Sequence, residues 1–291
     1  MQCNTVYIID GSSLIYRSFF ALPKLSTKNG FPTSAIYGFL RSMLAIMKSE
    51  RPKCLVVIFD HPAPTKREKV YREYKINRPK MPDPLKVQIP VIKELLKIMG
   101  IPMIEKEGYE ADDIVGFLAI KFSSEGKKVK IYTPDKDMLQ LVSDNVIVIN
   151  PMNNEIFDRE KVFKKYGVFP EKIPDFLALV GDKVDNIEGI KGVGQKKAVE
   201  ILKKYQSVEN ILRNWDRFSK EYPEADREKL ELSYYLVKLH TEVGGEFGEI
   251  NVELKEPDWN LLEKRIKDLE MKSLLKDVDI LKVAKKQATL F

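Results

Sequence analysis

Residues 108–137, GYEADDIVGFLAIKFSSEGKKVKIYTPDKD, combine a helix pattern with a strand pattern. In the first half, apolar residues recur at the 3.6-residue spacing of a helix that buries one face: Ala111, Ile114, Val115, Leu118 and Phe122. The second half contains a short run of β-branched and aromatic residues, 129–133, that ends at a proline, as buried strands often do. The sequence therefore predicts a helix followed by a strand.

Acidic residues gather at the ends of these two elements. Three open the helix and two follow the strand: Glu110, Asp112, Asp113, Asp135 and Asp137. Acids at a helix start often complement the helix dipole, and this explanation would suffice for Asp112 alone. Five acids this close resist joint ionisation unless cations neutralise them. Because oxygen ligands suit Mg²⁺, Mn²⁺ and Ca²⁺, the pattern predicts a carboxylate metal centre.

Two other predicted strands also end in an acid. Residues 6–9 precede Asp10, and the apolar run LVVIF, residues 55–59, precedes Asp60. Ligands bind at the carboxyl ends of strands in open α/β sheets. Together with Asp135, these residues make capping alone an insufficient explanation.

The alternation of strands and helices up to about residue 170 predicts an α/β fold with a mainly parallel sheet, covered by helices on both faces. Ser12 or Ser13 is expected to cap the first helix. Further helices are expected over 34–48, 66–78, 85–99 and 159–166, and a strand over 146–149. Composition shifts near Pro170, so we expect two parts, a catalytic core over 1–170 and a helical part over 171–291.

The positive charge is concentrated in one strip. The formal net charge is +6, and residues 66–80, KREKVYREYKINRPK, hold seven basic and two acidic residues, or +5 of it. Helical spacing places four residues on one face beside Lys75: Arg67, Tyr71, Tyr74 and Arg78. Charged helices are usually only solvated, but tyrosines interleaved with cations suit phosphate contacts and base stacking. A polyanionic partner is therefore expected.

A second stretch indicates contact with a nucleic-acid backbone. Asp182 and Asp185 follow an apolar helix, and the turn GIKGVG, residues 189–194, leads to Lys196 and Lys197. Glycines allow the backbone to approach a ligand closely, and N–H groups at a helix start favour phosphate. Many helical hairpins turn on glycine without binding anything. Beside a basic strip, however, this turn favours nonspecific DNA contact.

Composition argues against several classes of function. The 291 residues are 44% hydrophobic and 32% charged, and no apolar run reaches the ~18 residues that a membrane span requires. There is no GxSxG, HExxH or Walker A pattern. Cys3 and Cys54 lack metal-ligand spacing, which favours a reducing cytosol, and the Lys/Glu/Ile-rich composition hints at a thermophile. His240 and Trp215 are expected to be packing residues.

The combined motifs resemble those of the 5′-nuclease of bacterial DNA polymerase I and its flap-endonuclease relatives. They run in family order over about residues 4–245: IIDGSSLIYRSFFAL, AIYGFL, VIFD, TKREKVYREYKINRPKMP, GYEADD, TPDKDMLQLV, LVGDKVDNIEGIKGVGQKKA and LELSYYLVKLHTEV. Glu188 departs from the usual proline but removes no ligand. The resemblance implies a PIN-like core with a helical arch at 64–84 and a helix-hairpin-helix motif at 174–205.

The resemblance also implies a structure-selective 5′-3′ exonuclease and flap endonuclease that uses two Mg²⁺ ions, with Mn²⁺ as a substitute. Nine acids match the family's metal ligands: Asp10, Asp60, Glu110, Asp112, Asp113, Asp135, Asp137, Asp182 and Asp185. Lys75 and Arg78 would stabilise charge on the reacting phosphate. A K⁺ ion is implied at the helix-hairpin-helix. The expected DNA contacts are Arg67, Tyr71, Arg72, Tyr74, Gly189, Lys191, Gly192, Gly194, Lys196 and Lys197.

The implied substrates are 5′ flaps, free 5′ ends, nicked duplex and RNA primers, cut by a cytoplasmic, nucleoid-associated monomer in primer removal and DNA repair. The tail 282–291 ends in QATLF, which resembles the QLxLF-type peptides that dock on the bacterial sliding clamp. Gln287, Leu290 and Phe291 match, whereas Ala288 replaces a leucine. This tail favours a free-standing nuclease over a domain cut from a polymerase.

Two alternatives remain open. A non-catalytic DNA-junction-binding module of the same fold would be favoured by loss of acids such as Asp135 and Asp185, which are retained. A small-molecule phosphohydrolase with Asp10 as nucleophile would need an aspartate two residues later, where Ser12 stands.

Overall fold

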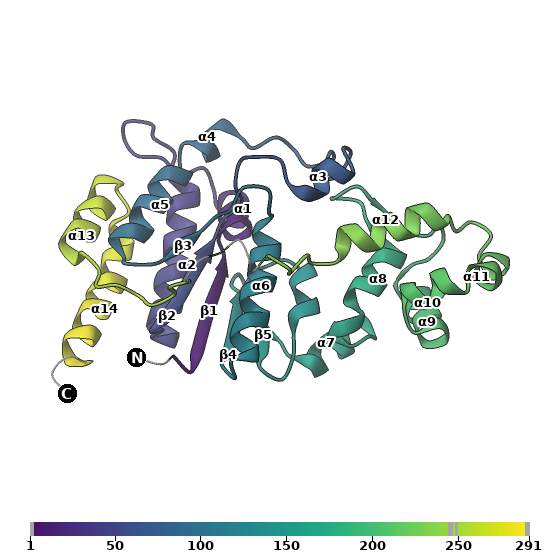
Figure 1. Ribbon diagram of the computed structural model, residues 1–291. Helices are drawn as coiled ribbons and strands as arrows, with labels where there is room; N and C mark the ends of the chain where they lie inside the picture. Colours follow the sequence, from purple (N-terminus) through teal and green to yellow (C-terminus); the bar gives the residue numbers. More distant parts are fainter. Residues whose placement is uncertain (1–2, 244–246, 248–249, 289–291) are drawn as a thin grey trace.

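A six-stranded sheet forms the centre of the molecule in the computed structural model, which describes residues 3–243, 247 and 250–288 (Figure 1). The strand order is β3-β2-β1-β4-β5-β6. The bounds are β1 (Thr5–Asp10), β2 (Cys54–Ile58), β3 (Met103–Ile104), β4 (Lys128–Tyr132), β5 (Val146–Asn150) and β6 (Glu155–Phe157). The first five strands are parallel and β6 is antiparallel to β5. The predicted mainly parallel α/β sheet is confirmed.

The central strands are apolar throughout because both faces of the sheet are covered. In β1, Val6 and Ile8 belong to one hydrophobic core, whereas Tyr7 and Ile9 belong to the other. Successive side chains of a strand point to opposite faces. A strand buried on both faces therefore carries a continuous apolar run instead of an alternating pattern.

Helices from both ends of the chain cover one face of the sheet. They are α1 (Gly11–Ala21), α2 (Ser34–Glu50), α4 (Asp83–Lys86), α5 (Ile89–Ile98), α13 (Trp259–Asp268) and α14 (Leu275–Ala288). The helix expected over 85–99 is interrupted at Gln88, which is buried. The Oε1 atom of Gln88 accepts hydrogen bonds from the backbone N–H groups of Ala35 and Ile36. Gln88 thus satisfies the start of α2, whose N-cap makes no side-chain bond.

The other face of the sheet carries α6 (Ala111–Ser124) and leads to a second, helical domain (Figure 1). Between α6 and residue 237 the chain forms, besides strands β4 to β6, the elements η1 (Asp137–Leu141), α7 (Arg159–Tyr166), η2 (Pro170–Lys172), α8 (Ile173–Val180), β7 (Gly181–Asp182), β8 (Ile187–Glu188), α9 (Gln195–Tyr205), α10 (Val208–Arg213), α11 (Trp215–Glu221) and α12 (Arg227–Val237). Strands β7 and β8 form a small antiparallel hairpin between α8 and α9.

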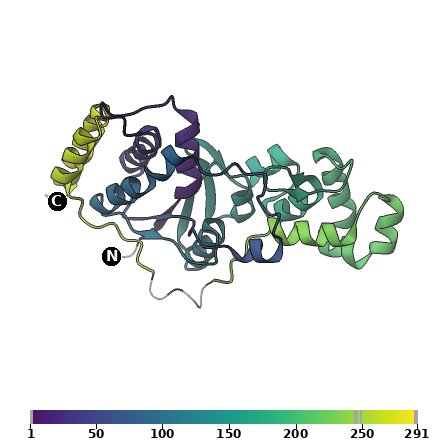
Figure 2. The ribbon, with the colours of Figure 1, turned by 90° about the horizontal axis from the view of Figure 1, so that it is seen from above.

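The last two helices do not stay with this helical domain. Figure 2 shows α13 and α14 at the opposite end of the molecule from α11. The described residues 250–258 return along β2, where the Leu55 N–H donates to the Val252 carbonyl at 2.8 Å. The short helix η4 (Lys272–Leu274) then joins α13 to α14, which packs against α2. The expected grouping of 171–291 as one helical part thus differs from the structure, in which residues 259–288 complete the first core.

The basic strip forms a much shorter helix than expected. The predicted helix over 66–78 is reduced to α3 (Lys66–Val70), which a capping box between Thr65 and Glu68 starts. Beyond Val70 the chain turns, and Lys75 adopts a left-handed conformation with φ of 59°. The reason is tertiary, because the Lys75 N–H donates to the Asp185 carbonyl of the β7–β8 hairpin at 3.0 Å instead of continuing a helix.

A disulfide joins Cys3 to Cys54 at the start of β2. The expectation of two reduced cysteines is therefore wrong for this structure, in which the N-terminal segment lies beside β2. Disulfides inside cells are rare except in hyperthermophiles, where they are common. Within the described part of the chain, no helix is both long and apolar enough to cross a lipid bilayer.

Candidate active site

The acids that follow strands converge at the carboxyl edge of the sheet. Asp10 ends β1 and is fully buried, and its carboxylate accepts hydrogen bonds from the Ser13 N–H at 3.0 Å and the Thr133 hydroxyl at 2.7 Å. Asp10 is therefore the cap of α1, and the expectation of Ser12 or Ser13 is wrong. The Ser12 hydroxyl instead accepts from the Asp60 N–H at 2.9 Å.

The start of α6 lies against the same edge. The Asp60 Oδ1 atom accepts a hydrogen bond from the Ala111 N–H at 2.8 Å, so Asp60 caps α6 from another element. Glu110 is buried and receives Lys75 Nζ at 3.0 Å and the Tyr74 hydroxyl at 3.4 Å. Asp112, in the first turn of the helix, lies close enough to Asp10, Glu110 and Asp135 for their charges to act on it.

The segment after β4 and the β7–β8 hairpin supply the remaining acids. Asp135 Oδ1 accepts from the Asp137 N–H at 2.9 Å, which orients this turn. Asp182 accepts from the Val184 N–H at 2.8 Å and from Lys136 Nζ at 2.7 Å. The structure thus gathers eight of the nine predicted ligands at one end of the sheet: Asp10, Asp60, Glu110, Asp112, Asp135, Asp137, Asp182 and Asp185.

Burial and repulsion by neighbouring carboxylates raise the pKa of three of these acids, Asp10, Asp112 and Asp137. Burial raises the pKa of Asp10 to about 6, and the charge of Asp135 adds to the shift. Burial and the charges of Asp135 and Asp10 raise the pKa of Asp112 well above its usual value. Burial and the charges of Asp135 and Asp185 do the same to the pKa of Asp137. Such clustered, destabilised carboxylates are typical of functional sites.

The donor set fits a hard divalent cation. All eight side chains offer oxygen atoms, the ligands that Mg²⁺ and Mn²⁺ prefer. Asp137 Oδ1 is buried, and it has no hydrogen-bond partner among the residues that the structure describes. Leaving a buried carboxylate oxygen unsatisfied is costly, so such groups in native proteins call for a ligand. Bound cations would relieve both the repulsion among the carboxylates and the unsatisfied Asp137 oxygen.

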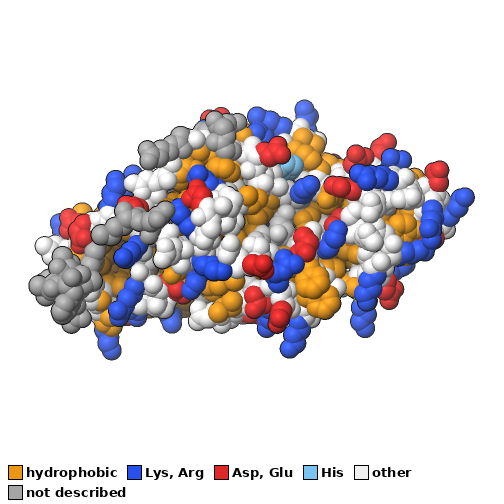
Figure 3. Space-filling model, turned by 60° about the horizontal axis from the view of Figure 1, so that its bottom comes forward, with side chains coloured by type: hydrophobic (Ala, Val, Ile, Leu, Met, Phe, Trp, Pro, Cys, Tyr) orange, Lys and Arg blue, Asp and Glu red, His pale blue; other side chains and the backbone are white. Residues whose placement is uncertain are grey.

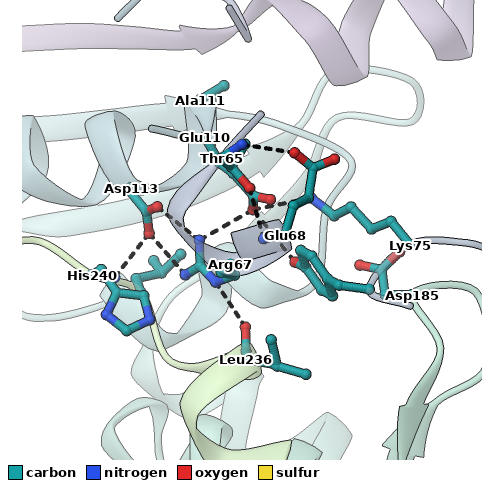
Figure 4. A network of polar contacts seen from close by, with 12 residues as sticks. Thr65, Arg67, Glu68, Lys75, Glu110, Ala111, Asp113, Asp185, Leu236 and His240 are labelled. Carbon is teal, nitrogen blue, oxygen red and sulfur yellow. Dashed lines mark hydrogen bonds and ion pairs between the residues drawn. The ribbon is translucent and has the colours of Figure 1, made fainter. Parts of the chain in front are cut away.

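Asp113 does not join this cluster. Figure 4 shows its carboxylate directed toward Arg67 and the backbone of His240. Both oxygens bind the Arg67 guanidinium, at 2.7 and 2.8 Å, and Oδ1 also accepts from the His240 N–H at 2.8 Å. The prediction that Asp113 binds metal is contradicted by this geometry, because its oxygens are already occupied by a buried cation and an N–H group.

Arg67 and Tyr74 are also placed differently from their prediction as DNA contacts. Arg67 is only 2% exposed and donates to the carbonyls of Leu236 and Lys238, at the end of α12 (Figure 4). Tyr74 is buried against Glu110, and burial raises its pKa. Neither side chain can reach a bound strand. The face expected from helical spacing does not form, because α3 ends at Val70.

The two predicted arch cations lie over the carboxylates. Lys75 Nζ pairs with Glu110, and Arg78 makes two hydrogen bonds to Asp185, at 2.7 and 2.9 Å. Although burial opposes it, the charge of Glu110 raises the pKa of Lys75, which stays protonated. Arg72 is exposed and Tyr71 is half-buried, so both remain accessible from solvent.

The residues of the glycine turn and of the helix start that follows differ in their exposure. Gly192, Gly194, Lys196 and Lys197 are exposed, in agreement with an accessible backbone contact. Lys191 is also exposed and pairs with Glu224 at 3.1 Å. Gly189 is packed instead, because an added Cβ would lie 2.3 Å from the carbonyl oxygen of Val180. Gly189 therefore serves the close approach of two chain segments, and its role as a DNA contact through the backbone stays a prediction.

Three residues at the site were not anticipated from sequence. Thr133 bridges Asp10 and the Asp135 N–H, and Lys136 binds Asp182. Tyr16, half-buried on α1, lies close enough to Asp60 that burial and this charge raise its pKa. Thr133 and Lys136 flank Asp135 in sequence, which was an available signal. Tyr16 had only its position on the helix after Asp10.

Figure 3 shows one face of the molecule, on which acidic and basic side chains are interspersed. Lysine and arginine side chains project along the end formed by the helical domain, on the right of this view. On this face, accessible positive charge therefore lies on the helical domain.

Comparison with known proteins matches both parts of the chain. Residues 5–167 match the family described as 5′-3′ exonuclease, N-terminal resolvase-like domain, and residues 168–260 match 5′-3′ exonuclease, C-terminal SAM fold. The chain is 63% identical to the 5′-3′ exonuclease of Aquifex aeolicus, over 99% of this chain and 100% of that protein. The chain belongs to the 5′-3′ exonuclease family. The resemblance inferred from sequence is confirmed, and with it the assignment as an exonuclease.

Relatives of this exonuclease include longer proteins. DNA polymerase I of Caldicellulosiruptor bescii is 40% identical over 95% of this chain, which spans 34% of that protein. DNA polymerase I of Thermus thermophilus is 40% identical over 95% of this chain and 33% of its own length. The exonuclease described here thus corresponds to about a third of the polymerases that it matches.

Solved structures show the same fold. The T5 5′-exonuclease with bound zinc ions has a TM-score of 0.67 at 20% identity, over 95% of this chain and 99% of that one. The catalytic core of Rad2 in complex with a DNA substrate has a TM-score of 0.63 at 20% identity, over 96% of this chain and 91% of that one.

Proposed function

We propose that this exonuclease cuts DNA at 5′ flaps and free 5′ ends, and RNA primers paired to DNA, by a two-metal mechanism. The observation that carries the proposal is the cluster of eight carboxylates, with an orphan buried oxygen on Asp137. The metal-bound T5 exonuclease and the DNA complex of Rad2 support it by analogy of fold. Primer removal and DNA repair are the processes that need such an activity.

The cluster divides into two sets of ligands. Following the family pattern, one Mg²⁺ would be held by Asp10, Asp60, Glu110 and Asp112. The other would be held by Asp112, Asp135, Asp137 and Asp185, with Asp182 binding directly or through water. Mn²⁺ is expected to substitute because it accepts the same oxygen ligands. When bound, two such ions activate water and stabilise the attacking and leaving oxygens of a phosphodiester.

The arch residues supply the rest of the chemistry. Lys75 and Arg78 lie against Glu110 and Asp185, so their charges face the place where a phosphate would meet the cluster. Cations fixed in advance of reaction stabilise the negative charge that develops on the phosphate. In-line attack by water would leave a 5′-phosphate on the downstream product. Tyr71 and Arg72 are positioned to contact the strand nearby.

The helical domain would hold the duplex. Lys196 and Lys197 are exposed at the start of α9, beside the glycine turn. Lysines and backbone N–H groups at this place suit phosphate oxygens without reading sequence. Gly192, Gly194 and Lys191 belong to the same surface. The carbonyl groups of the turn, in a helix-hairpin-helix arrangement of α8 and α9, are a candidate site for K⁺.

The C-terminal tail is proposed to bind the bacterial sliding clamp. The side chains of Gln287, Leu290 and Phe291 lie outside the described residues, so this proposal depends on sequence alone. A Leu-Phe pair would fill an apolar pocket. The expected Kd is in the micromolar range, which corresponds to a binding free energy on the order of −7 to −8 kcal/mol. A labelled peptide of residues 282–291 should bind the clamp in fluorescence polarisation. Equal binding after replacement of Leu290 and Phe291 by alanine would refute the proposal.

A monomer acting in the cytoplasm, near the nucleoid, is consistent with these roles.

A non-catalytic junction-binding module is the alternative function. Among the ligands, Asp135, Asp137, Asp182 and Asp185 are all retained and grouped together, which favours catalysis.

The test is incubation of the purified protein with an end-labelled 5′-flap duplex, first with Mg²⁺ and then with EDTA. Cleavage near the flap base with Mg²⁺, its loss in EDTA and a 5′-phosphate on the downstream product are expected. Flap binding without cleavage at any Mg²⁺ or Mn²⁺ concentration would support the non-catalytic alternative.

A further inference from the structure

Two loops from different domains meet beside the carboxylates. One is the arch segment, residues 71–78, after α3, and the other is the hairpin turn, residues 183–186, between β7 and β8. The Lys75 N–H donates to the Asp185 carbonyl, and Arg78 binds the Asp185 carboxylate. The arch therefore does not stand alone but contacts the hairpin that carries a proposed metal ligand.

Two asparagines join these loops reciprocally. Asn77 Nδ2 donates to Asn186 Oδ1 and to the Lys183 carbonyl, both at 3.1 Å. Asn186 Nδ2 in turn donates to the Glu73 carbonyl at 3.0 Å and to the Tyr71 hydroxyl at 3.3 Å. Each amide thus spans the gap between the loops, and the Asn186 amide uses both its donor and its acceptor group.

We call the hydrogen bonds made by the Asn77 and Asn186 amides across the two loops the clasp. The backbone conformation shows why the clasp matters. Lys75 and Asn186 both have positive φ, 59° and 57°, which side-chain-bearing residues adopt infrequently. A strained conformation of this kind persists where the surroundings determine it. Here the clasp lies on both sides of Lys75, through Glu73 and Asn77. It therefore fixes the loop that presents Lys75 to Glu110.

We propose that Asn77 and Asn186 are positioning residues that hold Lys75 and Arg78 of the arch against the carboxylate cluster. This inference rests on the proposed role of these two cations in turnover. Neither asparagine contacts the cluster itself. Because a displacement of about 1 Å can cost about 10²-fold in rate, loss of the clasp should lower kcat by about 10- to 100-fold. Binding to duplex phosphates, which the helical domain provides, should be unchanged.

The variants are chosen to separate side chain from backbone. Asn186→Gly removes the Asn186 amide but keeps the left-handed conformation accessible. Asn77→Ala removes the Asn77 amide. Asn154→Gly is the matched control, since Asn154 has φ of 57° in an exposed turn next to β6. Lys75→Ala measures the contribution of the cation itself.

Single-turnover and steady-state kinetics on a 5′-flap duplex with Mg²⁺ give the first readout. Both clasp variants should lose kcat with KM changed less than about twofold, and the double variant should be no slower than the slower single one, because the two residues share one contact. Asn154→Gly should match wild type. Trypsin gives a second readout, since cleavage after Arg72 and Lys80 should accelerate when the clasp is lost.

Each contrary result is decisive. Wild-type kcat and unchanged tryptic rates in both clasp variants, beside a slow Lys75→Ala, would overturn the clasp and leave the proposed function intact. Additive losses in the double variant, or a rise in KM alone, would also overturn it. Wild-type kcat in Lys75→Ala would overturn the proposed role of this cation, and the clasp inference with it.

Discussion

Arg67 Nη1 lies 2.7 Å from Asp113 Oδ2, and Nη2 of the same guanidinium lies 2.8 Å from Oδ1, with both side chains almost wholly buried. This pair connects the base of the arch to α6, and through the Leu236 carbonyl to α12 (Figure 4). Two residues that resemble a DNA contact and a metal ligand in sequence therefore hold three elements together. Their role is to set the relative positions of the parts that form the site.

Breaking this pair should destabilise the protein strongly. Arg67→Met leaves the Asp113 carboxylate buried without its cation, which typically costs about 3–5 kcal/mol. Asp113→Asn should cost less, because Arg67 Nη1 keeps its ion pair with Glu110 Oε2 at 3.2 Å. Urea denaturation would measure the loss. Glu221→Gln is the control, because the Lys204–Glu221 pair is surface-exposed and such pairs contribute little to stability. Wild-type stability of Asp113→Asn together with loss of metal binding would instead make Asp113 a ligand.

Stability without divalent metal should fall as the pH rises from about 4.5 to 7. Burial raises the pKa of Asp10 to about 6 and raises those of Asp112 and Asp137, so the folded state binds protons that the unfolded chain releases. The stability contributed by these groups is present below the unfolded pKa and is lost as the pH passes the folded pKa. Melting temperatures in EDTA would show the decline, and Mg²⁺ should offset it at pH 7. A melting temperature that rises throughout this window would contradict the shifts.

The affinity for flap DNA should depend on the lysines of α9. Replacing both Lys196 and Lys197 with alanine should reduce the slope of log K against log salt by about one unit per lost phosphate contact. Turnover at saturating DNA should change little. Filter binding at several salt concentrations measures the slope. An unchanged slope would place the duplex elsewhere on the protein.

Reduction of the Cys3–Cys54 disulfide should lower the melting temperature. The two cysteines are 51 residues apart in sequence, and closing a loop of this size stabilises a protein by about 4 kcal/mol in the chain-entropy model. For a domain of this size the change corresponds to roughly 10 °C. Thermal melts with and without dithiothreitol measure it. Cys3→Ser should already show the lower value and should not respond to the reductant.

The sheet and most of the site could be predicted from sequence because the signals are local. Apolar runs of strand length and acids at their ends identify β1, β2 and β4, and the topology brings Asp10, Asp60 and Asp135 to one edge. Asp112 and Asp113 show where local signals end. Consecutive helical residues point about 100° apart, so both cannot face one cluster, yet sequence alone does not say which one does.

The arch could not be predicted, since long-range contacts decide its shape. Net charge identifies residues 66–80 as basic. It does not show that the Arg67 side chain donates hydrogen bonds to the carbonyls of Leu236 and Lys238, 169 and 171 residues further along the chain. Likewise, nothing local indicates that the segment after Val70 leaves the helix to contact Asn186 and Asp185. Helices α13 and α14 return to the first core through their apolar faces, and the sequence does not show which surface those faces pack against.

The role of the carboxylate cluster is tested by one comparison, the single-turnover cleavage of an end-labelled 5′-flap duplex by wild type and Asp137→Asn across a Mg²⁺ titration. Asp137 carries the orphan buried oxygen, so its replacement should remove a metal ligand without disturbing phosphate contacts elsewhere. We expect a loss of at least ~10³-fold in rate, on the scale of an electrostatic transition-state contact or more, with flap affinity retained. Near-wild-type cleavage by Asp137→Asn at saturating Mg²⁺, or cleavage by wild type in EDTA, would contradict the two-metal mechanism.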